Sequence, residues 1–195
     1  MIKIHKLALG LYQTNTYIIH DETSKTCCVI DPGYEAATIL REVAHLGLEV
    51  EAILLTHGHF DHVGAVKDMV AETDCEVYIC DGDLVLPPMF TNGKLYYSQT
   101  YADGDTLHLA GLEIGVLNTP GHTPGSVCLT CENMMFSGDT LFEGGCGRTD
   151  IGGSWPQIKD SLARLAGLDT DYIVYPGHGG STTLAIEKRY NPYMR

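Results

Sequence analysis

Short apolar runs bounded by turn residues recur along the whole chain, and they restrict the fold more than any other feature of the sequence. Continuous apolar runs of about four to eight residues are typical of strands buried on both faces. Between some of these runs, apolar residues recur at the spacing of one helix face. The strand-like runs are 27–30, 50–55, 76–80, 112–117, 127–130 and 172–175, and the helical patterns cover 36–46, 63–70 and 158–165. The chain therefore predicts an α/β fold in which helices cover a buried sheet.

The length of 195 residues, with 44% hydrophobic residues, predicts a single domain over residues 1–195. The least regular segment is 83–105, which contains Pro87-Pro88, Asn92-Gly93 and the aromatic residues Phe90, Tyr96, Tyr97 and Tyr101. Long loops of this kind are usually functional or disordered. We expect an ordinary surface loop here, and the alternative is a loop whose aromatic side chains line a substrate pocket.

The charge balance excludes two classes of partner. Twelve Lys and Arg residues against 25 Asp and Glu residues give a net charge of −13, which repels phosphate backbones and anionic lipids. The sequence has no apolar stretch of membrane-spanning length and its start lacks the features of a signal peptide. We therefore expect a cytoplasmic protein with a small-molecule substrate and no nucleic-acid or membrane partner, in an oligomeric state that the sequence leaves open.

The segment Thr56 to His62, THGHFDH, directly follows the apolar run 50–55 and holds three imidazoles and one carboxylate. Such groups need polar partners when they lose water, and a metal ion can serve several of them at once. His57 and His59, two residues apart, share one side of an extended segment, whereas Asp61 and His62 turn with the following helix. This spacing favours two adjacent metal positions at a strand-to-helix turn, where α/β sites commonly lie.

Three further strand-like runs end in turns that carry a potential metal ligand. His122 lies in NTPGHTPGS, Asp139 in FSGDT and His178 in YPGHG. Five of the nine histidines thus fall in glycine-containing or polar turns after apolar runs, a pattern that unrelated core or surface histidines rarely produce. The sequence predicts that these side chains converge on a metal centre.

Taken together, these motifs resemble those of the metallo-β-lactamase-fold hydrolases, and the resemblance spans nearly the whole chain. It implies an αββα four-layer sandwich, in which two mixed β-sheets are flanked by helices. It also implies two divalent metal ions per chain, with Asp61 and Asp139 as the catalytic residues among their ligands. The implied ligands are His57, His59 and His122 for one ion, Asp61, His62 and His178 for the other, and Asp139 as the bridge between the two.

Within this superfamily, the stretch Ser137 to Asp150, SGDTLFEGGCGRTD, is most similar to the glyoxalase II group of hydroxyacylglutathione hydrolases. That similarity implies hydrolysis of hydroxyacyl-thioesters such as S-lactoylglutathione. β-Lactam hydrolysis is disfavoured, because the commonest zinc lactamases carry a cysteine where Asp139 stands. The chain ends shortly after His178, so we expect no helical C-terminal domain of the kind that carries glutathione contacts in longer glyoxalase II enzymes, and hence loose specificity for the thiol.

Two alternatives to the thioesterase remain open. Residues 145–150, GCGRTD, are similar to a stretch in the persulfide dioxygenases, which share the fold and use a single iron. A hydrolase of another ester or an amide is the second alternative. Two divalent ions sharing a water lower its pKa to about 7, so that hydroxide can attack a thioester without a separate general base. Imidazole and carboxylate ligands suit zinc, which we expect, or iron or manganese.

Two residues outside the ligand set each have a functional and an ordinary interpretation. Asp31, in VIDPG, can accept a hydrogen bond from a ligand histidine, or it can form a turn before Pro32. Arg148 can bind an anionic group of the substrate, or it can form a structural salt bridge with Asp150 or Glu143. For Arg148 we favour the structural role.

Overall fold

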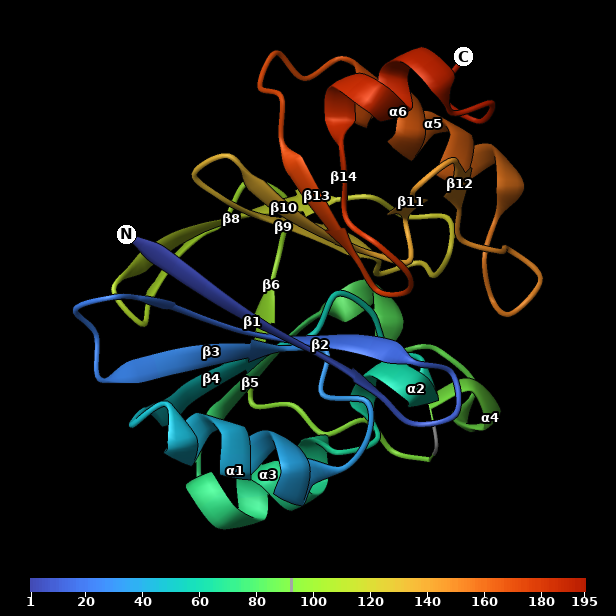
Figure 1. The fold of residues 1–195 in the computed structure, drawn as a ribbon. Helices are drawn as coiled ribbons and strands as arrows, with labels where there is room; N and C mark the ends of the chain where they lie inside the picture. The colour runs from blue at the N-terminus through green and yellow to red at the C-terminus, as the bar shows by residue number, and fades with distance from the viewer. Residues whose placement is uncertain (92) are drawn as a thin grey trace.

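Two six-stranded β-sheets lie face to face in the computed structural model, which describes residues 1–91 and 93–195. Figure 1 shows α1 (Ala36–His45) and α3 (Val66–Thr73) on the outer side of one sheet, with α5 (Trp155–Ala166) and α6 (Leu184–Tyr190) on the outer side of the other. Both sheets mix parallel and antiparallel pairs. The expected αββα sandwich is confirmed.

The first sheet has the strand order β1-β2-β3-β4-β5-β6. A long antiparallel hairpin, β1 with β2, forms one side, and the remaining strands from β3 onward run parallel. The short helix α2 (Phe60–Val63) follows β4 directly. The strands are β1 (Ile2–Leu9), β2 (Thr14–Asp21), β3 (Thr26–Ile30), β4 (Glu49–Leu54), β5 (Glu76–Cys80) and β6 (Gln99–Tyr101).

The second sheet has the order β14-β13-β10-β9-β8-β7. Four strands, β7 to β10, form an antiparallel meander, and β13 joins it parallel to β10. A small hairpin of β11 (Leu141–Phe142) and β12 (Gly145–Cys146) follows β10. The strands of the sheet are β7 (Thr106–Leu109), β8 (Leu112–Asn118), β9 (Val127–Cys131), β10 (Met134–Gly138), β13 (Ile173–Pro176) and β14 (Thr182–Thr183).

Neighbouring residues of the central strands pack into different hydrophobic clusters. On β2, Ile19 lies in the cluster between the sheets, whereas Ile18 lies in the cluster beneath α1 and α3. On β9, Leu129 faces the other sheet and Cys128 faces α5. Successive side chains of a strand point to opposite faces, so a strand covered on both sides needs apolar residues without alternation. This is the physical reason for the continuous apolar runs in the sequence.

The segment 83–105 differs from the single long loop that we expected. It contains the short helix α4 (Pro88–Thr91) and the strand β6, which extends the first sheet, and the 3-10 helix η1 (Asp81–Asp83) leads into it. Asn92, which also belongs to this segment, lies outside the described residues. Within the described part of the chain, the model has no helix long and apolar enough to cross a membrane.

Candidate metal centre

The turn between β4 and α2 carries four of the seven expected metal ligands. β4 ends at Leu54, and α2 begins at Phe60, with His59 as its N-cap in an extended conformation. His57 and His59 therefore precede the helix, while Asp61 and His62 lie on its first turn. The three histidines are buried and Asp61 is half-buried, so this short segment brings four polar groups under the surface together.

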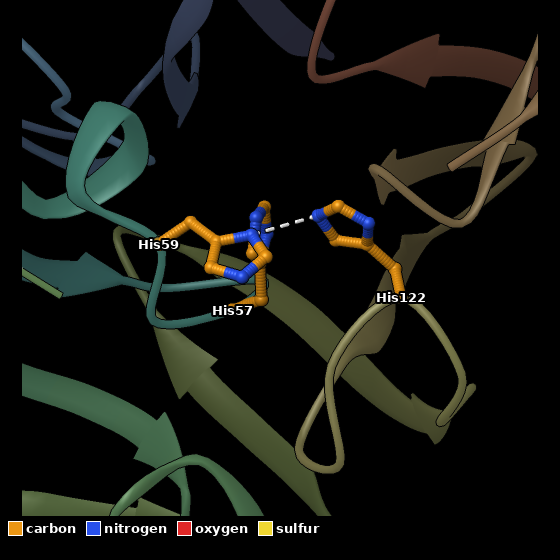
Figure 2. Close-up of side chains that lie close together, drawn as sticks. All are labelled: His57, His59 and His122. Carbon is orange, nitrogen blue, oxygen red and sulfur yellow. Dashed lines mark hydrogen bonds between the residues drawn. The ribbon is translucent and has the colours of Figure 1, made fainter. Parts of the chain in front are cut away.

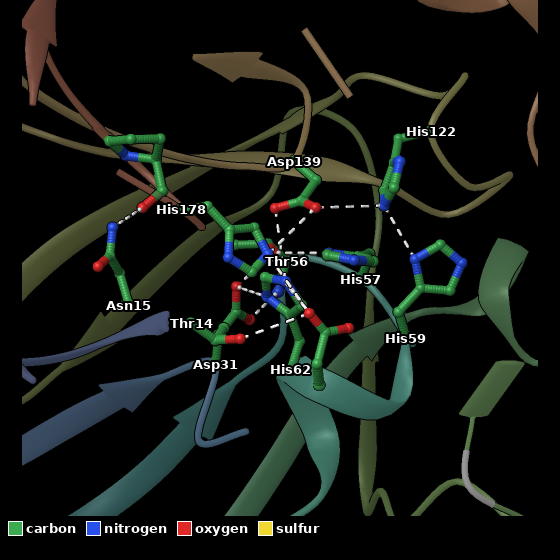
Figure 3. Close-up of polar contacts among 12 residues, drawn as sticks. Thr14, Asn15, Asp31, Thr56, His57, His59, His62, His122, Asp139 and His178 are labelled. Carbon is green, nitrogen blue, oxygen red and sulfur yellow. Dashed lines mark hydrogen bonds and ion pairs between the residues drawn. The ribbon is translucent and has the colours of Figure 1, made fainter. Parts of the chain in front are cut away.

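The other three expected ligands come from the second sheet. His122 lies in the turn between β8 and β9, Asp139 directly follows β10, and His178 follows β13. Figure 3 shows all three pointing toward the histidines of the β4–α2 turn. The structure thus brings together, from both sheets, all seven side chains that the motifs predicted.

The first cluster consists of His57, His59 and His122, whose ligand atoms all lie within 4.8 Å of one another. Figure 2 shows the three rings converging from two loops, with Nδ1 of His59 2.8 Å from Nε2 of His122. This separation brings two imidazole nitrogens to hydrogen-bond distance.

The second cluster consists of Asp61, His62 and His178, again with ligand atoms within 4.8 Å of one another. Nε2 of His178 is 3.3 Å from Oδ2 of Asp61, and Nε2 of His62 is 3.7 Å from the same oxygen. Asp139 lies between the two clusters: its carboxylate oxygens are 3.4 Å from Nε2 of His62, 3.5 Å from Nε2 of His122 and 3.6 Å from Nε2 of His178.

Backbone carbonyl groups decide which ring nitrogen carries the proton in three of the histidines. A carbonyl oxygen only accepts hydrogen bonds, so the nitrogen that faces it must be the N–H. The opposite nitrogen of each ring, which points into the cluster, then keeps its lone pair for a metal ion. The donors and acceptors are His59 Nε2 to Ile151 O (3.0 Å), His122 Nδ1 to Arg148 O (2.7 Å) and His178 Nδ1 to Tyr12 O (3.1 Å).

Asp31 orients the remaining two histidines. Its Oδ2 accepts from Nδ1 of His62 at 2.9 Å and from the hydroxyl of Thr56 at 2.5 Å. Because the Thr56 hydroxyl donates to Asp31, its oxygen accepts from Nδ1 of His57 at 3.1 Å. Of the two interpretations of Asp31, the hydrogen-bond acceptor for a histidine is therefore confirmed. Asp31, His57 and His62 also offer ligand atoms within 4.8 Å of one another, but the Asp31 oxygens already accept these hydrogen bonds.

Three inward-pointing atoms of the centre are buried and find no hydrogen-bond partner among the described residues: Nε2 of His57, Nε2 of His62 and Oδ1 of Asp139. A buried polar atom without a partner costs roughly 1–3 kcal/mol, and several in one place require a compensating group. Divalent cations satisfy lone pairs of this kind, and nitrogen and oxygen ligands suit zinc, iron and manganese alike. The residues present fit divalent metal ions.

The histidines of the first cluster are neutral at neutral pH. Burial lowers the pKa of His57 far below its ordinary value, and burial together with neighbouring histidines lowers the pKa of His59 to about 4. Burial also lowers the pKa of His122, although Asp139 opposes the shift. Neutral imidazoles are the form that binds metal ions.

The second cluster differs because it contains carboxylates. For His62, the lowering effect of burial is outweighed by Asp139, Asp31 and Asp61, and its pKa rises to about 9. For His178, burial is likewise outweighed by the hydrogen bond to Asp61, which raises the pKa. For Asp61, burial raises the pKa but His178 and His62 reverse the shift and lower it to about 2. Without metal, Asp61 and His62 therefore carry opposite charges at neutral pH.

Arg148 lies beside the centre, but its guanidinium is already paired. It donates two hydrogen bonds to Asp150, at 2.6 Å and 2.5 Å, on the exposed surface. The structural salt bridge, which we favoured from the sequence, is confirmed. The backbone of this loop, rather than the charged side chain, contacts the centre, because Arg148 O and Ile151 O accept the histidine N–H groups.

The aromatic residues of segment 83–105 divide into three groups. The Phe90 ring lies 6.2 Å from that of His59, at the edge of the first cluster. Tyr101 is buried between the sheets and donates a hydrogen bond from its hydroxyl to Leu55 O, so it is a core residue and the expected surface-loop position for it was wrong. Tyr96 and Tyr97 are exposed and line a cavity of about 780 Å³.

The sequence analysis missed the contribution of the first residues of β2. Thr14 pairs with His178 as an isolated β-bridge, and its hydroxyl donates to Oδ2 of Asp61 at 3.4 Å. The side-chain amide of Asn15 donates to Pro176 O at 2.9 Å and to Gly179 O at 3.0 Å, on either side of His178. These residues hold the β13 loop in place. Their sequence carries no distinctive signal, because their partners in the β13 loop lie more than 160 residues away.

The chain resembles a curated protein over its full length. It is 31% identical to the hydroxyacylglutathione hydrolase GloC of Haemophilus influenzae over 218 aligned residues, which cover 99% of this chain and 98% of that protein.

Three solved structures are also close in both sequence and fold. The BLEG-1 B3 metallo-β-lactamase has a TM-score of 0.90 and 31% identity, covering 100% of this chain and 99% of that one. TTHA1623 in a di-iron-bound form has a TM-score of 0.84 and 36% identity, with coverages of 97% and 99%. ETHE1 from Myxococcus xanthus has a TM-score of 0.83 and 32% identity, with coverages of 97% and 83%.

The family model of the metallo-β-lactamase superfamily matches residues 9–178, from the end of β1 to the last of the seven expected ligands. The matched range includes the strands β2 to β13 of the two sheets and every residue of the two clusters. The fold, the ligand clusters and this match agree, and the chain belongs to the metallo-β-lactamase superfamily.

Proposed function

We propose that this protein is a dinuclear metal-dependent hydrolase that cleaves hydroxyacyl-thioesters, such as S-lactoylglutathione, in the manner of glyoxalase II. One ion is assigned to the first cluster and the other to the second, with Asp139 bridging them. Zinc is the proposed metal, and iron is the main alternative because TTHA1623 has been solved in a di-iron-bound form. The proposed ligands are His57, His59 and His122 for one ion, and Asp61, His62 and His178 for the other.

One observation carries this proposal: five imidazoles each direct a ring nitrogen inward around a single carboxylate that approaches both clusters. Asp139 lies within 3.4–3.6 Å of histidines of the first and of the second cluster. A structural zinc site is usually closed by four ligands, whereas seven ligands shared by two ions leave coordination positions for water and substrate. The arrangement therefore suits catalysis better than a structural role.

Two adjacent divalent ions lower the pKa of a shared water to about 7 and polarise a carbonyl oxygen. The chain itself supplies rigidity: loop carbonyls, Asp31 and Thr56 hold the rings in the required tautomers, so little rearrangement is needed during the reaction. Asp61 is ionised throughout the neutral range because its pKa is about 2. A thiolate leaves with little acid assistance, since ordinary thiols have a pKa near 8.5. Hydrolysis of a thioester therefore needs little help from a general acid in this site.

The surroundings of the centre suit an uncharged acyl group. The Phe142 ring lies 6.3 Å from that of His178, and the Phe90 ring lies 6.2 Å from that of His59. On α2, Phe60 packs edge-on against Tyr12 at 5.6 Å, and both rings are partly exposed. With Arg148 paired to Asp150, we propose loose specificity for the thiol, so that trimming glutathione to a simpler thiol has a comparatively small effect.

The proposed partner is a small-molecule thioester, without nucleic acid or membrane, and the net charge of −13 supports this. We also propose a cytoplasmic location. All seven cysteines are free, and six of them are buried, as expected for thiols in a reducing compartment.

Similarity to other members of the superfamily favours two further candidate reactions. ETHE1 from Myxococcus xanthus is 32% identical, and a persulfide dioxygenase using one iron is the second candidate. In this chain each of the two clusters offers three ligand atoms within 4.8 Å of one another, which favours two metal ions over one. BLEG-1 is described as a B3 metallo-β-lactamase, so β-lactams belong in the test as amide substrates.

The experiment measures activity and metal content on one preparation. Purified protein is assayed with S-lactoylglutathione, with acyl-thioesters of simpler thiols, with a β-lactam, and for oxygen uptake with glutathione persulfide. We expect close to two metal ions per chain and thioester hydrolysis. Asp139→Asn should lose most of this activity, whereas Asp169→Asn, which changes an exposed carboxylate elsewhere, should not. One iron per chain with oxygen uptake and no hydrolysis would contradict the proposal.

A further inference from the structure

Asp83, at the end of η1, is a fully buried carboxylate that accepts three hydrogen bonds. Its Oδ2 accepts from the backbone N–H of Gly58 at 2.6 Å and from the hydroxyl of Thr123 at 2.9 Å. Its Oδ1 accepts from the backbone N–H of Gly125 at 2.6 Å. Charge-assisted hydrogen bonds of this length are about twice as strong as neutral ones. Asp83 therefore links three residues of the chain through strong hydrogen bonds.

The three donors belong to the two loops that carry the first metal cluster. Gly58 lies between His57 and His59, in the β4–α2 turn of the first sheet. Thr123 and Gly125 follow His122 in the β8–β9 turn of the second sheet. A single carboxylate thus joins a loop of each sheet, next to the histidines that the loops carry.

Both loops approach Asp83 through glycine. A Cβ atom at Gly125 would stand 2.8 Å from Oδ1 of Asp83, closer than real contacts allow, and one at Gly58 would stand 3.4 Å from Cβ of Asp83. Gly82 packs against the same loop, since a Cβ there would stand 2.9 Å from Pro124 O. The backbone of the two loops is therefore held at short range around one side chain.

Burying a charge costs free energy, and three hydrogen bonds offset that cost only while both loops stay in place. Burial raises the pKa of Asp83, and the hydrogen bonds from Thr123, Gly125 and Gly58 oppose that shift. If either loop moved away, the carboxylate would lose partners without gaining water. The separation of the two loops, and with it the separation of His57 and His59 from His122, is tied to this residue.

We propose that Asp83 is a positioning residue for the first metal site: through the backbone of both loops it sets the spacing of His57, His59 and His122. The inference rests on the proposed metal centre but not on the proposed substrate, so it stands or falls independently of thioester hydrolysis. Asn in place of Asp83 would direct an amide NH₂ at hydrogen-bond donors, which separates the loops without removing a metal ligand.

The test measures metal binding to metal-free protein by titration with Co²⁺, followed by visible absorption, and with Zn²⁺ in competition with a chelator. Asp83→Asn should weaken one of the two sites by about 10–100-fold, the usual effect of losing a group that orients metal ligands. The other site should keep its affinity. The His57→Ala variant identifies the affected site, because its spectrum contains the second site alone.

Asp81→Asn, which changes an exposed carboxylate two residues away, is the matched control and should bind both ions as the unchanged protein does. Thr123→Val removes one of the three hydrogen bonds and should weaken the same site to an intermediate degree; it also tests the proposal if Asp83→Asn fails to fold. Thermal unfolding of each metal-free variant separates lost stability from lost affinity. Wild-type affinity at both sites, or equal weakening of both, would overturn the proposal.

Discussion

At the scale of single residues, the two clusters lie side by side but differ in the pKa values of their histidines. The first cluster consists of histidines whose pKa values burial lowers, for example to about 4 for His59. The second contains carboxylates that outweigh burial and raise the pKa of His62 to about 9. A metal ion must therefore displace protons from the second cluster but not from the first.

This difference predicts how metal binding depends on pH. At pH 7, His62 is protonated in the metal-free protein because its pKa is about 9, so binding at the second site should release about one proton, while binding at the first should release close to none. Affinity at the second site should rise with pH up to about 9, the pKa of His62. Calorimetry in buffers of different ionisation enthalpy measures the release, and His57→Ala isolates the second site. Equal proton release at the two sites would contradict the assignment.

At the scale of secondary-structure elements, the helices fix the loops that carry the ligands. The turn that holds His122 packs against the start of α5: Ser154 N–H donates to Gly121 O at 2.7 Å. Gly121 has a φ of 139°, and a Cβ there would stand 2.2 Å from the backbone nitrogen of Ile158. Helix α5 is in turn held by Leu162 and Leu165 in the hydrophobic cluster outside the second sheet. The position of His122 thus depends on the packing of a helix.

Gly121→Ala should therefore disturb both stability and metal binding. Gly104→Ala is the matched control, because Gly104 also has a positive φ, of 86°, but a Cβ there meets no atom of the described residues within 4 Å. The control carries the backbone strain alone, whereas Gly121→Ala adds a steric clash worth about 1–3 kcal/mol in the free energy of unfolding. Chemical denaturation measures the difference, and metal titration should show weaker binding only for Gly121→Ala. Identical behaviour of the two variants would show that the loop adapts freely.

At the scale of the whole molecule, the metal centre connects the two sheets. Asp61 and three histidines follow β4 of the first sheet, while His122, Asp139 and His178 follow strands of the second. Figure 3 shows the histidines of both sheets meeting around Asp139. A ligand that binds only the folded protein stabilises it by a free energy that grows with the logarithm of the ligand concentration relative to the dissociation constant. Bound metal ions should therefore stabilise the contact between the layers as well as the local loops.

Removal of the metal should lower the melting temperature of the protein. At a free metal concentration one hundredfold above the dissociation constant, each site contributes about 2.7 kcal/mol, which corresponds to a shift on the order of 5–10 °C for a chain of this size. Thermal unfolding with and without a chelator measures the shift, and His57→Ala should show a smaller one. A melting temperature that does not change with chelator would mean that the clusters bind no metal in the folded state.

Much of the architecture was predictable because it depends on local patterns. The runs 27–30 and 76–80 became β3 and β5 almost residue for residue, and the helical pattern at 158–165 lies within α5. The hairpin of β1 and β2 was missed, because β2 buries polar side chains such as Thr16 and Asn15 that a sequence pattern assigns to the surface. Their partners, Asp31 O for Thr16 and Pro176 O for Asn15, lie in other elements.

The seven candidate ligands could be identified from the sequence alone, since each lies in a short motif whose residue types have no ordinary use in a hydrophobic core. Only the tertiary structure decided the tautomers of these histidines and the spacing of the loops that carry them. The tautomers depend on carbonyl groups of Tyr12, Arg148 and Ile151, and the loop spacing depends on Asp83. The structure also decided that Arg148 is paired with Asp150. The physical reason is that residue types and periodicity are local properties, whereas hydrogen bonds between distant segments exist only once the two sheets have packed together.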